Sequence, residues 1–119
     1  VYKRQGVATE VADMPRAVVT DGCFLYRTRT GKLLMIWSSF HGKDYATGIA
    51  ESTTGKVAGP WRQQTEPLYT SDGGHGMLFH TFDGKLCIVL HSPNSGNERA
   101  HIFRVNDLGN TLTLGQEVK

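Results

Sequence analysis

Two residues of this 119-residue chain stand where a side chain could do acid–base or ligand chemistry. Asp21 lies in Thr20-Asp21-Gly22, directly before an apolar run, and His75 lies between Gly74 and Gly76, before a second such run. A positioned carboxyl can transfer a proton, and an imidazole changes charge near neutral pH. Glycine beside either side chain lets backbone or ligand approach closely. The alternatives stay open, because Asp-Gly is a common turn and a histidine beside glycine can be a hydrogen-bonded structural residue.

The elements that must position these residues repeat at a spacing of 53 residues. That shift places residues 24–39 on residues 77–92 with six of sixteen positions identical, among them Gly31-Lys32-Leu33 on Gly84-Lys85-Leu86. In this frame Asp21 falls on Gly74, so Asp21 and His75 are one residue apart. Both therefore belong to the turn that precedes the first strand of a repeat.

Each repeat predicts four antiparallel strands. An apolar hairpin turns at Thr30-Gly31 or Asp83-Gly84, since glycine supplies the positive φ of a two-residue hairpin turn. Both strands of each hairpin lack clean polar alternation, which predicts burial on two faces. A third run follows at 45–52 and 98–105, and a weaker, more polar fourth at 61–65 and 111–114. This pattern favours an all-β fold, a β-propeller fragment of about two four-stranded blades; a duplicated β-sandwich is the alternative.

The repeat divides the chain into a leader or end of a preceding blade at 1–20, a blade at 21–73 and a blade at 74–119. Propellers typically have about 4 to 8 blades, and an isolated pair would expose apolar faces. We therefore expect either missing propeller blades or self-association to complete the fold. The abrupt start at Val1 also suits a fragment or a processed product.

Composition excludes several partners. The net charge of +2 is small and scattered, which argues against nucleic acid. No apolar run approaches the roughly 18 to 20 residues of a transmembrane helix, so no membrane partner is expected. Cys23 and Cys87 form no metal motif, and both are expected to be small buried hydrophobes in strands.

The order of these motifs resembles the C-terminal two blades of the family 43 glycoside hydrolases, five-bladed propellers that include arabinanases, arabinofuranosidases and β-xylosidases. The stretches that carry the resemblance are Thr20 to Tyr26, Tyr45 to Ser52 with Gly59-Pro60-Trp61, and Gly74-His75-Gly76-Met77 through His91. They are similar to the start of the family's blade four, to the end of that blade, and to the glycine–histidine–glycine motif of blade five. The resemblance covers nearly the whole chain from residue 20.

The resemblance implies an inverting hydrolase of arabinose- or xylose-containing plant polysaccharides or oligosaccharides. Asp21 falls on the family's general acid, while the two other carboxylates would precede Val1 and the chain alone would be inactive. His75 falls on a histidine at the propeller centre that is associated with the bound sugar and with a calcium ion. Calcium is thus the implied cofactor and His75 the implied metal contact, although a histidine nitrogen is a poor direct ligand for Ca²⁺. Gly22 and Phe40 are the other expected substrate contacts.

Two departures bear on this expectation. The acid position holds Asp where the family usually has Glu, so the carboxyl is one methylene shorter, and Cys23 replaces the usual proline. A non-catalytic carbohydrate-binding propeller and an oligomeric scaffold of two-blade subunits therefore stay open as alternatives. The resemblance favours a periplasmic or extracellular location.

Overall fold

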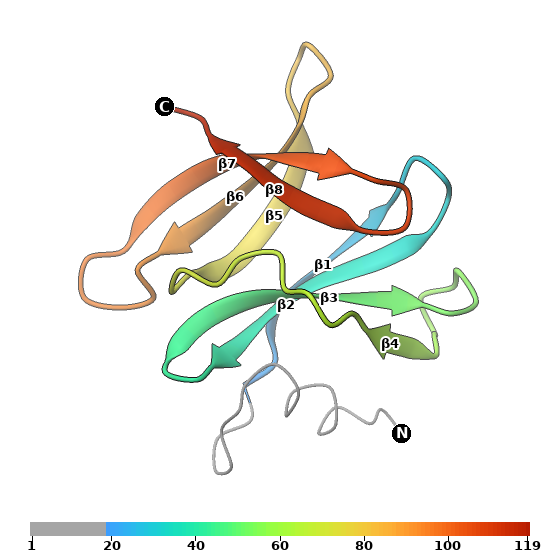
Figure 1. Cartoon of the computed structure of the whole chain (residues 1–119), viewed down its shortest axis with the longest axis horizontal. Helices are drawn as coiled ribbons and strands as arrows, with labels where there is room; N and C mark the ends of the chain where they lie inside the picture. Colours follow the sequence, from blue (N-terminus) through green and yellow to red (C-terminus); the bar gives the residue numbers. More distant parts are fainter. Residues whose placement is uncertain (1–18) are drawn as a thin grey trace.

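The computed structural model describes residues 19–119 as eight antiparallel strands in two sheets (Figure 1). The expected leader 1–20 lies outside the described residues except for its last two. The first sheet consists of β1 (Asp21–Arg27), β2 (Leu33–His41), β3 (Asp44–Ser52) and β4 (Trp61–Gln63). The second consists of β5 (Gly74–His80), β6 (Leu86–Ser92), β7 (Arg99–Asp107) and β8 (Leu112–Glu117). The predicted all-β fold with four strands per repeat is confirmed.

The strands follow one another through each sheet in chain order, β1-β2-β3-β4 and β5-β6-β7-β8. No strand crosses from one sheet to the other, as strands of a Greek-key sandwich would. The order is that of two consecutive propeller blades. Residues 19–119 contain no helix, and so none that could span a membrane.

Both sheets share one register and one irregularity. In each, the pairing of the first strand with the second shifts by one residue near the start of the first strand, which is a β-bulge. The pairs on either side of the shift are Asp21 with Ser38 and Phe24 with Ile36 in the first sheet, and Gly74 with His91 and Met77 with Val89 in the second. Each pair lies 53 residues from its counterpart, so the repeat extends to the bulge that carries Asp21 and His75.

The hairpin turns also repeat. Thr28 N donates to Lys32 O at 2.8 Å and Gly31 N to Thr28 O at 2.9 Å, and the equivalent bonds close the turn at Gly84. Three residues therefore lie between the closing pair, one more than the two-residue turn that the sequence suggested. Gly31 has a φ of 90°, which is the left-handed residue that such a three-residue loop requires.

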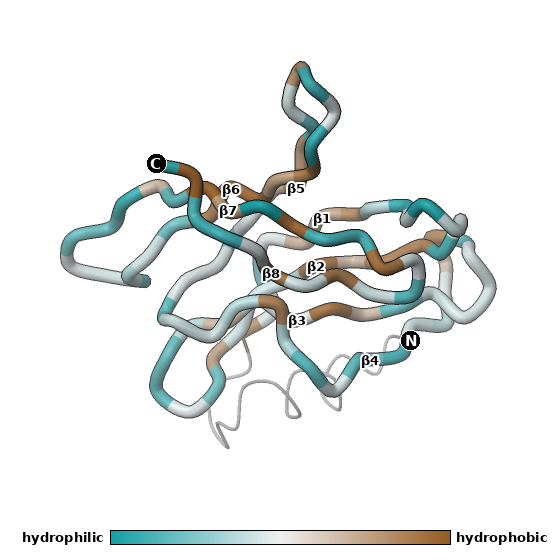
Figure 2. Tube along the Cα trace, turned by 45° about the horizontal axis from the view of Figure 1, so that its top comes forward, coloured by the Kyte–Doolittle hydropathy of each residue, from teal (hydrophilic) through white to brown (hydrophobic). Residues whose placement is uncertain are grey.

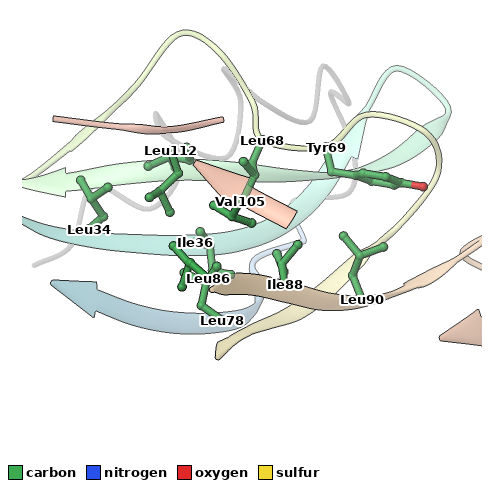
Figure 3. Packing of buried hydrophobic residues seen from close by; sticks show 11 residues of the cluster. Leu34, Ile36, Leu68, Tyr69, Leu78, Leu86, Ile88, Leu90, Val105 and Leu112 are labelled. Atoms are coloured by element: carbon green, nitrogen blue, oxygen red, sulfur yellow. The ribbon is translucent and has the colours of Figure 1, made fainter. Parts of the chain in front are cut away.

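The core lies between the two sheets (Figure 3). Its buried residues come from β2 and β3, from the segment before β5, and from all four strands of the second sheet: Leu34, Ile36, Ile49, Leu68, Tyr69, Leu78, Leu86, Ile88, Leu90, Val105 and Leu112. Figure 2 shows the hydrophobic segments on the central strands and mostly hydrophilic connections between them. This packing brings the start of β1 against the start of β5.

The predicted burial on two faces is confirmed over most of β2 and β6, the second strands of the hairpins. It is wrong for the first strands, β1 and β5, because alternate side chains point to opposite faces and only one face meets the other sheet. Leu25 on β1 is 39% exposed, and Met77 and Phe79 on β5 are 56% and 37% exposed. Cys23, on the open face of β1, is exposed as well, whereas Cys87 is buried as expected.

Candidate functional site

His75 occupies the place in the second sheet that Gly22 occupies in the first. Gly22 has a φ of 55° and His75 a φ of 53°, so both adopt the left-handed conformation at the bulge of their strand. For a residue with a side chain this conformation costs on the order of 1 kcal/mol, and the surrounding structure must hold it. His75 N donates to Ser38 Oγ at 2.8 Å, which is one such restraint.

The glycines around His75 are required by packing. A Cβ at Gly74 would lie 2.6 Å from Ser38 Oγ, and one at Gly76 would lie 2.9 Å from Ile88 Cδ1. A Cβ at Gly22 would lie 2.8 Å from the Cα of His75. Real contacts of a Cβ are longer than these. Gly22 and Gly74 therefore let the bulges of the two sheets interlock, while Gly76 makes room for Ile88 of its own sheet. The expected close approach is therefore an approach of protein to protein.

The bulges place the Asp21 carboxylate beside the His75 imidazole. Asp21 Oδ2 lies 3.4 Å from His75 Nδ1, and the two side chains are 51% and 58% exposed. Asp21 Oδ1 accepts a hydrogen bond from Gly22 N at 2.9 Å. Both predicted residues thus meet at the solvent edge of the contact between the sheets.

Tyr45, which the sequence did not single out, completes this group. Its hydroxyl donates to Asp21 Oδ2 at 3.3 Å, while the residue is only 4% exposed. Desolvation by burial, and then the charge of Asp21 and the hydrogen bond to it, raise the pKa of Tyr45 to about 12; a hydrogen bond with Ser38 opposes the shift. The phenol is therefore protonated, and available as a donor, at every ordinary pH.

Aromatic rings hold Tyr45 in place. Phe40, which was expected to contact substrate, lies within β2, and its ring packs edge-on against the Tyr45 ring, with centroids 5.2 Å apart. The His91 ring lies 5.8 Å away, and His91 Nε2 is 3.2 Å from Asn94 Oδ1. Phe40 thus reaches Asp21 only through Tyr45.

Asp72 supports the same region from the segment before β5. Its carboxylate accepts hydrogen bonds from Tyr45 N at 3.0 Å and from Asn94 N at 3.1 Å. These backbone donors lower the pKa of Asp72. Its φ of 58° is again left-handed. Because it is occupied by two amides, Asp72 acts as a structural anion that ties β3 to the loop after β6.

Sequence reasoning found Asp21, Gly22 and His75, and the structure brings all three together. It missed Tyr45, Ser38 and Asp72. Ser38 could have been found, because the repeat frame places Asp21 at the start of β1 and an antiparallel hairpin then pairs it with the end of β2. Tyr45 gave a weaker signal: it begins the third apolar run, where any aromatic residue suits a core.

Among residues 19–119, no group of three or more His, Cys, Asp or Glu side chains is arranged to hold a metal ion. Ca²⁺ takes about six to eight oxygen ligands. His75 Nδ1 faces a single carboxylate, which is already bonded to Tyr45 and Gly22. The described residues do not by themselves fit a calcium site, and no chemical step here depends on one.

A shallow open depression adjoins His75 on the uncovered face of the second sheet. Its lining combines apolar side chains of β5 and β6, such as Met77 and Val89, with the polar residues His91, Glu98 and Arg99. Asp21 does not line this depression. Its apolar part includes Met77, which lies on the face of β5 that the first sheet leaves uncovered.

Two solved structures share this fold. One is an endo-arabinase from Bacteroides thetaiotaomicron, with a TM-score of 0.73 and 42% sequence identity over 83% of this chain and 38% of that protein. The other is an endo-1,4-beta-xylanase from the same organism, with a TM-score of 0.69 and 24% identity over 85% of this chain and 39% of that protein. No family model matches the sequence, and no curated protein matches it significantly. The chain spans about two fifths of either structure, and its two sheets have the fold of that segment.

Proposed function

We propose that this chain is part of an inverting glycoside hydrolase of the five-bladed propeller type. It would act on arabinose- or xylose-containing plant polysaccharides or oligosaccharides, with Asp21 as the general acid. The observation that supports this most is the Asp21 carboxylate, oriented by Tyr45 and faced by His75 in a segment 42% identical to an endo-arabinase. The half-exposed side chain is open to a ligand on its solvent side.

In the proposed reaction, Asp21 gives its proton to the glycosidic oxygen as the bond to the anomeric carbon breaks. Inversion also needs a second carboxylate, about 6.5 to 9.5 Å away, that activates a water on the opposite face of the sugar. Asp72 is unsuited to that role, because two backbone amides occupy its carboxylate and lower its pKa. The base is therefore proposed to lie outside residues 19–119, and this chain alone to be inactive.

The proposed partners are a carbohydrate substrate and further blades. Leu25 on one open face, and Met77 and Phe79 on the other, are the apolar side chains that such blades would cover. Self-association of two-blade units is the alternative way to cover them. A calcium ion at the propeller axis would need most of its ligands from those blades, with His75 at its edge. The proposed location is periplasmic or extracellular.

Asp21→Asn in the full-length protein tests the proposed acid. The amide keeps the shape but has no acidic proton, so kcat on an arabinan oligosaccharide should fall by about 100-fold or more, within the range that general acids contribute. Oligosaccharide binding, measured by calorimetry, should be largely kept. Asp83→Asn is the control. It removes the same charge in the exposed turn after β5, at the other end of that strand from His75, and should leave kcat and oligosaccharide binding unchanged.

A non-catalytic carbohydrate-binding propeller is the second candidate. It is favoured by the short Asp side chain and by the donors that already engage both of its carboxylate oxygens. Turnover by the full-length protein distinguishes the two candidates. A binding protein has no turnover, so Asp21→Asn would have none to remove. Retained turnover in that variant would rule out the proposed acid.

A further inference from the structure

Tyr45 connects the buried core to the exposed carboxylate of Asp21. The tyrosine is 4% exposed and the Asp21 side chain is 51% exposed, yet the phenol reaches Oδ2 at 3.3 Å. This is a hydrogen bond from a fixed interior group to a group at the surface. Such a bond can orient the surface group more strictly than solvent would.

The phenol is held from three directions. Phe40 packs edge-on against its ring, with centroids 5.2 Å apart, and the His91 ring lies 5.8 Å away. The backbone amide of Tyr45 donates to Asp72 Oδ1 at 3.0 Å. The position of the hydroxyl is therefore set by residues of β2, β6 and the segment before β5, none of which depends on Asp21.

The Asp21 carboxyl then has little rotational freedom. Gly22 N engages Oδ1 at 2.9 Å and Tyr45 engages Oδ2, while His75 Nδ1 lies 3.4 Å from Oδ2. Asp has one side-chain torsion fewer than Glu, so two such contacts are enough to select one orientation. Each carboxyl oxygen retains a further lone-pair site for the transferred proton or for a ligand.

We propose that Tyr45 is a positioning residue for Asp21, and that its hydrogen bond strengthens as Asp21 loses its proton to the leaving group. This inference rests on the proposed function. In the acid step the O–H bond of Asp21 breaks, the proton joins the glycosidic oxygen, and the electron pair of the breaking C–O bond stays on that oxygen. Asp21 becomes a carboxylate, and hydrogen bonds to charged groups are roughly twice as strong as those between neutral groups. Tyr45 thus favours the transition state over the ground state.

Tyr45→Phe in the full-length protein removes only the hydroxyl oxygen and keeps the ring that packs on Phe40. On an aryl arabinofuranoside with a poor leaving group, kcat should fall about fivefold to tenfold with little change in KM, as expected for a bond made stronger in the transition state. On a dinitrophenyl substrate, whose leaving group needs little protonation, the loss should be within twofold. Tyr69→Phe, which removes the same atom from another buried tyrosine, should leave both rates unchanged.

The ratio of the two rates within one preparation is the decisive measurement, because it does not depend on the fraction of protein that is folded. An unchanged ratio in Tyr45→Phe, even with both rates lowered, would mean a purely structural role and would overturn the inference. The second measurement combines Tyr45→Phe with Asp21→Asn. If Tyr45 acts through Asp21, the double variant is no slower than Asp21→Asn alone, whereas independent losses would multiply.

The two proposals fail in different ways. If Asp21→Asn keeps its rate on the poor leaving group, the proposed general acid is wrong and Tyr45 has no acid to position. If Asp21→Asn loses that rate and Tyr45→Phe does not, the proposed function stands and only the role of Tyr45 is wrong.

Discussion

Gly22→Ala should be among the most damaging small substitutions in this chain, for a reason that the structure makes quantitative. Gly22 has a φ of 55°, and a side chain in that left-handed conformation costs about 1 kcal/mol. The added Cβ would also lie 2.8 Å from His75 Cα and 2.9 Å from His75 Cγ. Because the nearest of these is a backbone atom of β5, the strand must move, and overpacking of this kind costs about 1–3 kcal/mol. The expected loss is therefore about 2–4 kcal/mol.

Gly42→Ala is the matched control for this variant. Gly42 has a φ of 65°, similar to that of Gly22, but no atom lies within 4 Å of its ideal Cβ position. It should lose only the conformational term, about 1 kcal/mol. Urea unfolding followed by circular dichroism measures both losses, and the shift of the midpoint at constant slope gives each one. Equal losses in the two variants would refute the interlocking of the Gly22 and His75 bulges.

Two further predictions concern stability. Asp107→Ala should cost about 2–3 kcal/mol in the same assay, because the carboxylate accepts charge-assisted bonds from Tyr26 Oη at 2.9 Å and Arg29 N at 2.8 Å and so joins the two sheets; the exposed Asp83→Ala should cost about 0.5 kcal/mol or less, and a similar loss in both would contradict this role. The pKa values of Tyr26 and Tyr45 are both raised from 10 to about 12, chiefly by desolvation, so the stability that they contribute is complete below pH 10 and lost as the pH rises to 12. Phenolate absorbance near 295 nm should show that Tyr26 and Tyr45 titrate late, and Tyr45→Phe should remove part of this late absorbance; if the substitution leaves the late absorbance unchanged, the raised pKa of Tyr45 is contradicted.

The repeat made most of the fold predictable. Residues 24–39 and 77–92 carry the same hairpin, and the structure gives both copies the same register and bulge. Burial of the first strands was less predictable, because Leu25 and Met77 are apolar yet lie on faces that the other sheet does not cover. An apolar side chain indicates that its face of the sheet can be buried. It does not show whether this chain contains the element that would bury it.

The candidate site was likewise predictable only in part. The types and spacing of Asp21 and His75 were visible in the sequence, because both precede the first strand of a repeat beside glycine. The frame also implied that His75 aligns with Gly22 rather than with Asp21. The strain that follows, a histidine with a φ of 53°, required the backbone to be seen.

The sequence by itself thus determined the strands, the repeat, and the positions of Asp21 and His75 at the starts of β1 and β5. These features depend on the local residue pattern and on glycine at turns. Only the tertiary structure decided which side chains meet. The contact of Tyr45 with Asp21 joins residues from β3 and β1, which are not neighbours in the sheet, and the contact of Asp21 with His75 joins two sheets. Such contacts arise from how sheets twist and pack against each other, which no local pattern of residues specifies.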